Sequence, residues 1–246
     1  MELTALGFDG WMEQNASPLL RPGHSLARVT AVDRGGFVVR NRDGEFPAGL
    51  AGRMRFASGS ALDLPCVGDW VAVQCHASGG PAILHGVAPR RTFLRRKRAG
   101  RSVEFQMIAA NIDVALIVQA CAHDFNPARL DRYLVMVREG GIEPWIVLTK
   151  TDLVSPEHLA QALARVAHAC ASVRILTLSN TTGTGLHEIR ALLAPGRTYC
   201  LLGSSGVGKT TLINRLIGSD ALDTQEVSGT GEGVPTHSRR QLLPLA

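Results

Sequence analysis

Two patterns of apolar positions divide this chain. Between residues 23 and 89 apolar side chains recur at every second position over short runs, and Gly, Asp and Asn separate the runs. Alternation with this period is typical of strands with one buried face. The expected strands are Leu26–Val32, Phe37–Arg40, Arg53–Phe56, Trp70–Gln74 and Ile83–Val87.

Five strands of this length predict a small β-barrel. The OB fold is the five-stranded barrel that commonly binds oligonucleotides, although the pattern alone does not separate it from an SH3-like barrel. Trp70 is expected in the core, and Phe37 and Phe46 are candidates for stacking on bases. Residues 1–22 are interpreted as a loosely held N-terminal extension, to which the sequence assigns no role.

From residue 111 onward, buried strands alternate with amphipathic helices. This alternation predicts a doubly wound α/β domain with a parallel sheet, whose ligand lies at the carboxyl ends of the strands. The expected strands are 114–119, 144–148, 173–178 and 199–202, and the expected helices are 127–138, 156–170 and 185–193.

A phosphate-binding loop follows the last of these strands. Residues Gly203 to Thr210 fit the pattern G-x-x-x-x-G-K-[ST] between an apolar strand and an amphipathic helix. Backbone N–H groups of such a loop converge on phosphate oxygens, the lysine reaches the outer phosphates, and the hydroxyl can ligate Mg²⁺. Lys209 and Thr210 are therefore the candidate catalytic residues. The candidate phosphate-binding set is Gly203, Ser204, Ser205, Gly206, Val207, Gly208, Lys209, Thr210 and Thr211.

A second motif, Thr149-Lys150-Thr151-Asp152, follows the strand at 144–148 and resembles the N/T-K-x-D guanine-recognition element of GTPases. One carboxylate can accept both the N1–H and the 2-amino group of guanine, a donor pair that adenine lacks. Asp152 is thus expected to select the base. Thr149 in place of the commoner Asn keeps a hydroxyl but loses the amide's paired donor and acceptor.

The motifs occur in an unusual order. Ser179-Asn180-Thr181 looks like the S-A-K element that supports guanine from its other side, and both base motifs precede the phosphate loop. In an ordinary small GTPase the phosphate loop comes first. The order predicts a circularly permuted G domain. Permutation preserves the fold because the original termini of such a domain usually lie close together at its surface and can be joined.

At this point the chain resembles the bacterial RsgA or YjeQ family of GTPases that depend on the small ribosomal subunit. Residues 90–113 look like the segment that links the first two domains of these proteins, and 124–134 are similar to the first helix of their G domain and its lead-in. The resemblance implies a GTPase that assists late maturation of the small ribosomal subunit and binds its rRNA. It also implies GTP, GDP and Mg²⁺ as ligands, and an OB-fold barrel.

Basic residues gather in the proposed linker. Residues 90–101 contain seven basic residues and no acid, and the net charge of +5 belongs to residues 1–110. Such a run is often only a solvated surface, but it also suits the phosphates of RNA. The candidate RNA contacts are Arg90, Arg91, Arg95, Arg96, Lys97, Arg98 and Arg101.

Composition adds little to this picture. The hydrophobic content of 45% supports two domains with cores, and no apolar run is long enough to cross a membrane. The N-terminus lacks a secretory signal, so we expect a cytoplasmic protein without a membrane partner. We also expect it to be a monomer. The five cysteines are widely spaced and are interpreted as reduced thiols.

Two departures from the family pattern affect the expected activity. Where the family typically has G-x-H-T-T-T in its first switch, this chain has Gly-Val-Pro-Thr-His-Ser at 233–238, so only Thr236 matches as a further Mg²⁺ ligand. No D-x-x-G element and no zinc-binding Cys/His cluster follows before Ala246. We therefore expect a piece of a longer protein or a naturally short one, with zinc only if a cysteine-rich region lies beyond Ala246.

These expectations define four segments. They are an extension (1–22), an RNA-binding OB-like barrel (23–89), a basic linker (90–110) and a permuted GTPase domain that is incomplete at its C-terminus (111–246). The alternative is a module that binds guanine nucleotide and RNA but turns nothing over.

Overall fold

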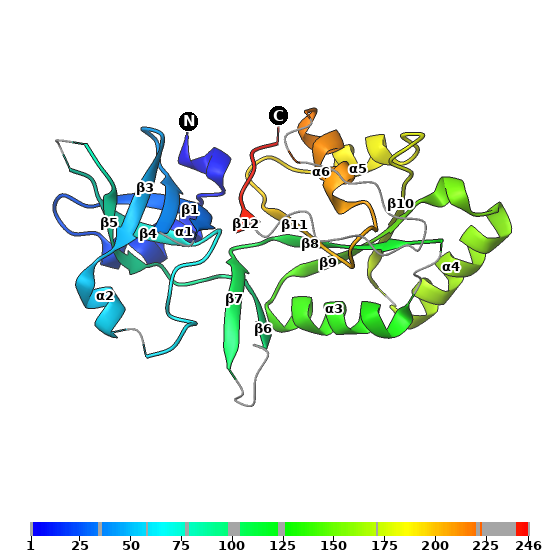
Figure 1. Cartoon of the computed structure of the whole chain (residues 1–246), viewed down its shortest axis with the longest axis horizontal. Coiled ribbons are helices and arrows are strands. Elements are labelled where there is room, and N and C mark those ends of the chain that lie inside the picture. The colour runs from blue at the N-terminus through cyan, green and yellow to red at the C-terminus, as the bar shows by residue number, and fades with distance from the viewer. Residues whose placement is uncertain are drawn as a thin grey trace. The chain divides into compact units, whose positions relative to one another are not determined.

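The computed structural model describes residues 2–33, 36–57, 59–76, 79–97, 104–122, 126–170, 172–219, 222 and 240–245. The chain forms two compact units, coloured mainly blue to green and green to orange in Figure 1. The first consists of Met1–Ile112 with Pro195–Thr198 and Arg239–Leu243, and the second of Asp113–Ala194 with Tyr199–Ser238 and Pro244–Ala246.

A closed β-barrel forms the body of the first unit. Its strands pair in the order β1-β2-β3-β5-β4, and β4 closes the barrel by pairing with β1. The pair β3–β5 is parallel and the others are antiparallel. This is the five-stranded OB fold that the sequence predicts. The strands are β1 (Ser25–Asp33), β2 (Gly36–Arg40), β3 (Glu45–Leu50), β4 (Trp70–Gln74) and β5 (Ala82–Val87).

One of the expected strands was wrong. Residues Arg53–Phe56 belong to a short helix, α2 (Gly52–Ala57), and the third strand is β3. Pro47 and Gly49 make β3 look like a turn in the sequence, yet it is held on one side by β2 and on the other by β5. Pairing on both sides thus outweighs weak local preference.

The N-terminal residues are packed rather than loosely held, so that expectation was also wrong. Two 3-10 turns, η1 (Leu3–Leu6) and η2 (Ser17–Leu19), flank helix α1 (Gly10–Ala16), whose N-terminus is capped by Asp9. Apolar residues of this segment pack around Trp70, which is 1% exposed. Burial of that many apolar side chains is enough to hold a short segment in place. The buried set is Leu3, Leu6, Met12 and Ala16.

The basic segment forms an antiparallel pair of strands, β6 (Phe93–Lys97) and β7 (Phe105–Ala110). These residues belong to the same compact unit as the barrel. A two-residue strand, β12 (Arg240–Gln241), pairs with β1 opposite Ala31 and Val32.

The second unit is a four-stranded parallel sheet in the order β10-β9-β8-β11. Helices α5 and α6 cover one face, and α3 and α4 lie on the other (Figure 1). The strands are β8 (Val114–Ala120), β9 (Glu143–Thr149), β10 (Arg174–Thr177) and β11 (Tyr199–Leu202). The helices are α3 (Pro127–Glu139), α4 (Pro156–Ala169), α5 (Leu186–Leu192) and α6 (Lys209–Ile217), with a 3-10 turn η3 (Thr151–Leu153) after β9.

This topology predicts a ligand site at the carboxyl ends of β8 and β11. The chain moves outward from β8 to β9 and β10, then returns through α5 to β11 on the other side of β8. Where the direction of winding reverses, the loops at the carboxyl ends of the strands diverge and leave room for a ligand. Beneath that point every second residue of β8 enters a core shared with Ile189 of α5 and Leu212 of α6.

Among the described residues, no helix combines the length and the apolar character needed to cross a membrane.

Candidate nucleotide site

The loop between β11 and α6 has a backbone that depends on glycine. Gly203 has φ +152°, and a Cβ there would lie 2.3 Å from the carbonyl oxygen of Val118 on β8. Gly206 and Gly208 also have positive φ, at +76° and +92°. A side chain at Gly203 would therefore force β8 and the loop apart, and the curved path fits the cradle that a phosphate group needs.

Lys209 is the first residue of α6, and its ammonium group lies over the loop. Its Nζ donates to the carbonyl oxygens of Gly203 and Ser204. Burial lowers the pKa of Lys209 below the ordinary lysine value. A cation partly withdrawn from water interacts strongly with an anion placed beside it.

The motif after β9 turns sharply at Lys150, which adopts the left-handed conformation with φ +59°. Asp152 follows in η3 and is exposed. The N–H of Thr151 donates to the carbonyl of Leu178, which lies just beyond the end of the neighbouring strand β10. The two base-recognition motifs are thus adjacent through their backbones.

The second base motif is a compact turn held by Ser179. Its side chain is 1% exposed, and its Oγ accepts a 3.1 Å hydrogen bond from the N–H of Thr182. The turn ends at Gly185, where a Cβ would lie 2.0 Å from the carbonyl oxygen of Thr177. Asn180 and Thr181 therefore occupy a fixed position at the carboxyl end of β10.

Both base motifs donate hydrogen bonds to the phosphate loop. Thr149 Oγ1 donates to the carbonyl oxygen of Val207 at 2.7 Å, and Asn180 Nδ2 donates to that of Gly208 at 3.1 Å. The structure thereby brings together three motifs that are widely separated in the sequence. Because Thr149 is 0% exposed, its side chain contacts the loop and is not free to contact a base.

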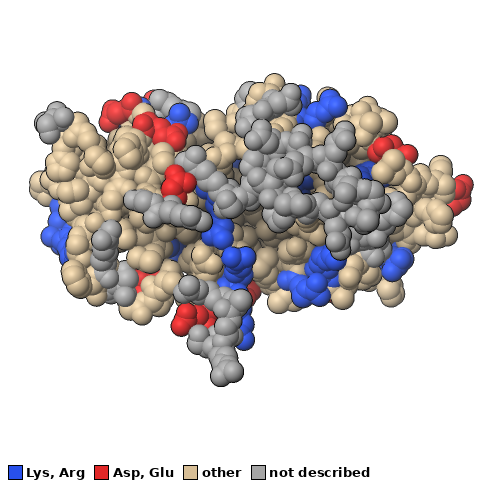
Figure 2. Space-filling view, in the orientation of Figure 1, with Lys and Arg blue, Asp and Glu red and all other residues tan. Residues whose placement is uncertain are grey.

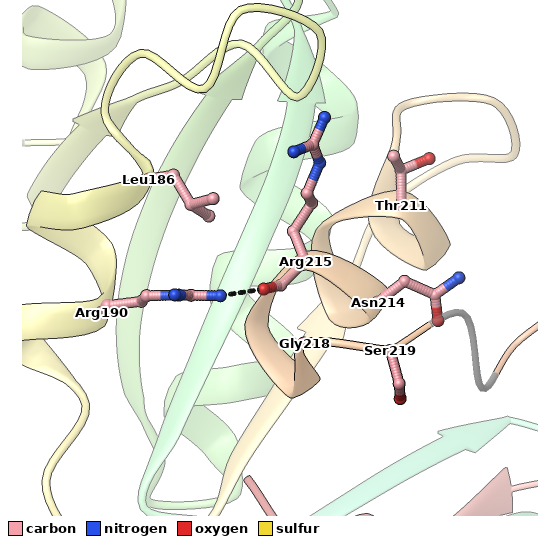
Figure 3. Close-up of a pocket in the computed structure, with 7 residues that line it drawn as sticks. All are labelled: Leu186, Arg190, Thr211, Asn214, Arg215, Gly218 and Ser219. Carbon is pink, nitrogen blue, oxygen red and sulfur yellow. Dashed lines mark hydrogen bonds between the residues drawn. The ribbon is translucent and has the colours of Figure 1, made fainter. Parts of the chain in front are cut away.

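Thr210 and Thr211 follow Lys209 in the first turn of α6, and Thr211 also borders a groove between α5 and α6 (Figure 3). The groove has a volume of about 690 Å³. Two of the lining residues are hydrogen-bonded to each other: Arg190 donates to the carbonyl oxygen of Arg215 in the last turn of α6. The carbonyls in the last turn of a helix have no partner within the helix, so Arg190 supplies one here. The other lining residues are Leu186, Asn214, Gly218 and Ser219.

Sequence reasoning missed the role of Asn214. This side chain is 6% exposed, and its amide both donates to and accepts from the backbone of Leu222, at 2.7 and 3.0 Å. The amide therefore fixes the chain just after the phosphate-loop helix. An Asn within an amphipathic helix is the signal that could have pointed to it, because Asn is disfavoured there.

Two of the candidate RNA contacts are used inside the first unit. Arg90 makes a two-pronged ion pair with the buried carboxylate of Asp69, at 2.8 Å on each oxygen, and also donates to the carbonyls of Leu62 and Leu64. Arg91 pairs with Asp9 at 2.7 Å and stacks on Trp11. A sequence run of basic residues does not reveal such partners, because they lie far away along the chain.

The remaining described basic residues of the run lie on β6. Arg96 and Lys97 are exposed, and Arg95 stacks against the rings of Phe93 and Phe105. Lysine and arginine side chains gather along the β6–β7 hairpin in Figure 2. Arg98 and Arg101 lie outside the described residues, as does Thr236 with the rest of the first switch.

The two candidate stacking residues of the barrel, Phe37 and Phe46, are partly buried against its core. Phe56 on α2 is 93% exposed, a position that the sequence pattern does not predict because it indicates a strand there. Trp70 lies in the core as expected.

All five cysteines are free thiols, as the sequence predicts. Burial raises the pKa of Cys121 to about 11 and that of Cys200 to about 12. Among the described residues, no group of three or more His, Cys, Asp or Glu side chains is arranged to hold a metal ion.

Comparison with known proteins adds a family to this geometry. The sequence matches the model of the RsgA GTPase family over residues 87–246. It is 37% identical over 254 residues to the small ribosomal subunit biogenesis GTPase RsgA of Syntrophotalea carbinolica, covering 100% of this chain and 68% of the relative. The corresponding protein of Opitutus terrae is 36% identical over 254 residues, with 100% and 69% covered.

Two solved structures have the same fold. YjeQ from Thermotoga maritima matches with a TM-score of 0.63 and 22% identity, over 78% of this chain and 64% of that one. YloQ, described as a circularly permuted GTPase, matches with a TM-score of 0.57 and 24% identity, over 79% and 64%. The chain thus spans about two thirds of the length of these relatives.

The family match covers more than half of the chain, and curated relatives align along its whole length. The barrel, the parallel sheet and the order of the nucleotide motifs agree with that match. This chain belongs to the RsgA family of circularly permuted GTPases.

Proposed function

We propose that this chain binds and hydrolyses GTP as an assembly factor in late maturation of the small ribosomal subunit. The observation that supports this most directly is the pair of hydrogen bonds from Thr149 and Asn180 to the phosphate loop. They join a guanine-type base motif, which follows β9, to the phosphate loop, which follows β11, at the carboxyl edge of one parallel sheet. A site for a base linked to a polyphosphate requires that juxtaposition.

Asp152 would select the base by accepting from N1–H and the 2-amino group of guanine. The amides of the Gly203–Thr210 loop and the Lys209 ammonium would hold the phosphates and stabilise the charge that develops on them as the terminal phosphate leaves. These groups position the substrate and neutralise charge, and they do not react covalently. Completion of the site would come from the ribosomal subunit.

A magnesium ion fits this arrangement. Nucleotide-bound Mg²⁺ takes few protein ligands, because phosphate oxygens and water supply the rest. Thr210 would contribute its hydroxyl from the first turn of α6, in the position that the loop pattern assigns to this ligand. When bound, the ion neutralises charge on the outer phosphates. Thr236 is proposed as a second ligand from the sequence alone.

Binding of GTP and turnover are tested separately. We expect fluorescent GDP to be displaced by GTP and GDP, and hardly by ATP. Equal competition by ATP would contradict the guanine assignment. Turnover is then measured with and without purified small ribosomal subunits. Tight binding without turnover in either condition would favour the alternative, a module that binds nucleotide and RNA but does not hydrolyse.

We further propose that the first unit contacts rRNA through the β6–β7 hairpin. The exposed charges of Arg96 and Lys97, with Arg95 beside them, suit a run of backbone phosphates. Arg90 and Arg91 are left out, because their guanidinium groups are engaged with Asp69 and Asp9. The protein would act as a monomer in the cytoplasm, where ribosomal subunits mature.

Replacing Arg95, Arg96 and Lys97 together with Ala tests this contact. We expect weaker binding to small subunits and a dependence of log affinity on log salt that flattens by about 2 to 3 units, since each lost phosphate contact removes about 0.7 to 0.9. A triple change of Arg132, Arg138 and Arg165 removes the same charge from the second unit and is the control. Equal effects of the two triple variants would mean that only net charge matters.

A further inference from the structure

We propose that Thr149 and Asn180 form a two-point brace that sets the phosphate loop against both base-recognition loops. This inference rests on the proposed function and assigns positioning roles within the same site. Two side chains from different loops donate to two consecutive carbonyls, those of Val207 and Gly208. Neither side chain needs to touch the nucleotide to affect its binding.

The contact made by Thr149 is fully enclosed. Its side chain is 0% exposed, its hydroxyl lies 2.7 Å from the Val207 oxygen, and the Val207 side chain is itself 1% exposed in the core of the second unit. A buried hydroxyl must find a hydrogen-bond partner. The Val207 carbonyl of the loop is the nearer one, at 2.7 Å, and the carbonyl of Gln119 on β8 lies at 3.4 Å. Val207 is therefore held by its side chain and by its carbonyl at once.

The contact made by Asn180 explains why position 208 is a glycine. A Cβ at Gly208 would lie 2.7 Å from Asn180 Nδ2, so the amide occupies the space that any larger residue would need. The φ of +92° at Gly208 independently requires glycine. The close approach of the Asn180 amide to the loop backbone therefore depends on glycine at position 208.

The second polar atom of this amide is also informative. Asn180 Oδ1 is buried and has no hydrogen-bond partner among the described residues. An unmet acceptor in a buried position costs free energy, which a water molecule or a bound nucleotide would recover. Because the Asn180 amide occupies this position despite that cost, we expect its hydrogen bond to the Gly208 carbonyl to contribute to nucleotide binding.

The brace links the two halves of the ligand. Thr149 is the last residue of β9 and Asn180 lies in the turn after β10, whereas Val207 and Gly208 lead into α6. Loss of either bond would let the loop shift relative to Asp152 and misalign base and phosphates. Affinity for guanosine, which has no phosphates, would change less than affinity for GDP.

The test measures GDP and guanosine affinity in four variants of this 246-residue chain. Thr149→Val and Asn180→Ala remove one donor each, and we expect GDP binding to weaken by about five- to tenfold, the size of one neutral hydrogen bond. Thr149→Ser keeps the hydroxyl and should stay within about twofold of the original protein. Thr182→Ala, in the same turn as Asn180, is the matched control and should also stay within about twofold.

The outcomes separate a brace from a general packing role. If Thr149→Val and Asn180→Ala both bind GDP as the original protein does, or if Thr149→Ser is as weak as Thr149→Val, the proposal is wrong. Equal losses for guanosine and GDP would also overturn it, because they would indicate damage to the base site alone. If the unmodified chain binds no guanine nucleotide, the proposed function itself fails, which is a different result.

Discussion

Asp152 and Lys209 lie in opposite surroundings, and each surrounding suits its proposed task. Asp152 is exposed in a short turn, where its carboxylate can reach the edge of a base. Lys209 is partly buried over the loop carbonyls, and burial lowers the pKa of its ammonium group. Asp152 can therefore accept hydrogen bonds from a base, and Lys209 presents a cation to the phosphates with little competition from water.

Asp152→Asn is expected to change the preferred base. The amide can no longer accept both guanine donors, but its N–H₂ can donate to the extra carbonyl of xanthine. We expect GDP affinity to fall by about 100-fold or more, and affinity for xanthosine diphosphate to exceed it. Competition binding with both nucleotides measures this. Asp131→Asn, an exposed change on α3, serves as control, and an unchanged GDP preference would remove Asp152 from the site.

The pKa of Lys209 predicts a pH dependence of GTP binding. The protonated amine binds the phosphates, and a lowered pKa means that the free protein loses this proton at a lower pH than an ordinary lysine would. The affinity contributed by Lys209 is therefore fully present at neutral pH and is lost as the pH rises through that lowered value. Comparing GTP affinity with that of Lys209→Ala between about pH 7 and 10 isolates the effect. A ratio that stays constant over this range would contradict it.

The candidate site was largely predictable at the level of single residues, because the motifs have fixed spacing and follow strands. Asp152, Lys209 and the loop glycines could be proposed from chemistry alone. Thr149 could not be interpreted correctly, since only the structure shows that its hydroxyl bonds to Val207. Spacing along a chain identifies residue types that suit a ligand, but it does not show which of them are occupied by other protein groups.

At the scale of elements, the hairpin segment shows that equal charges have unequal roles. Arg90 forms a buried ion pair with Asp69, whereas Arg96 lies exposed on β6. The same sequence run therefore contains a residue that stabilises the first unit and residues that are available to a partner.

Arg90→Ala is expected to destabilise the first unit by about 3–5 kcal/mol, because it leaves the Asp69 carboxylate buried and unpaired. Urea unfolding followed by Trp fluorescence measures the change in the free energy of unfolding. Arg40→Ala breaks the more exposed pair with Glu45, at 3.6 Å, and should cost no more than about 1 kcal/mol. Equal effects of the two changes would show that the buried ion pair has no special role.

Elements of the second unit were easier to predict than those of the first. In β8 all seven residues are buried, and the helices carry clear start signals at Asn126 and Ser155. The barrel strands are short, and Arg53–Phe56 fits a strand or a helix equally well over four residues. Pairing partners decide such cases, and these come from strands far away in the sequence.

At the scale of the whole molecule, the thiols provide a check on the packing of both units. Cys75 is exposed, whereas burial raises the pKa of the four other cysteines above the ordinary value. At pH 8 a thiol with a pKa of about 11 is ionised in about one molecule in a thousand, and the thiolate is the reactive form.

We therefore expect one thiol to react rapidly with a colorimetric disulfide reagent and four to react slowly. Cys75→Ser should remove the fast phase. Adding denaturant should make all thiols fast by exposing them. Two or more fast thiols in the native protein would mean that the core around Cys66, Cys121, Cys170 or Cys200 opens readily.

The order of strands also has a consequence for synthesis. As the chain leaves the ribosome, β8, β9 and β10 emerge one after another and can pair as sequential neighbours, whereas β11 must then insert beside β8. At about 5 to 20 residues per second, the first base-recognition motif is translated about 3 to 12 seconds before Lys209, and the second about 1.5 to 6 seconds before it. The nascent protein cannot hold a triphosphate during that interval. Its nucleotide site forms only when the last parallel strand docks, so GTP cannot stabilise earlier folding steps.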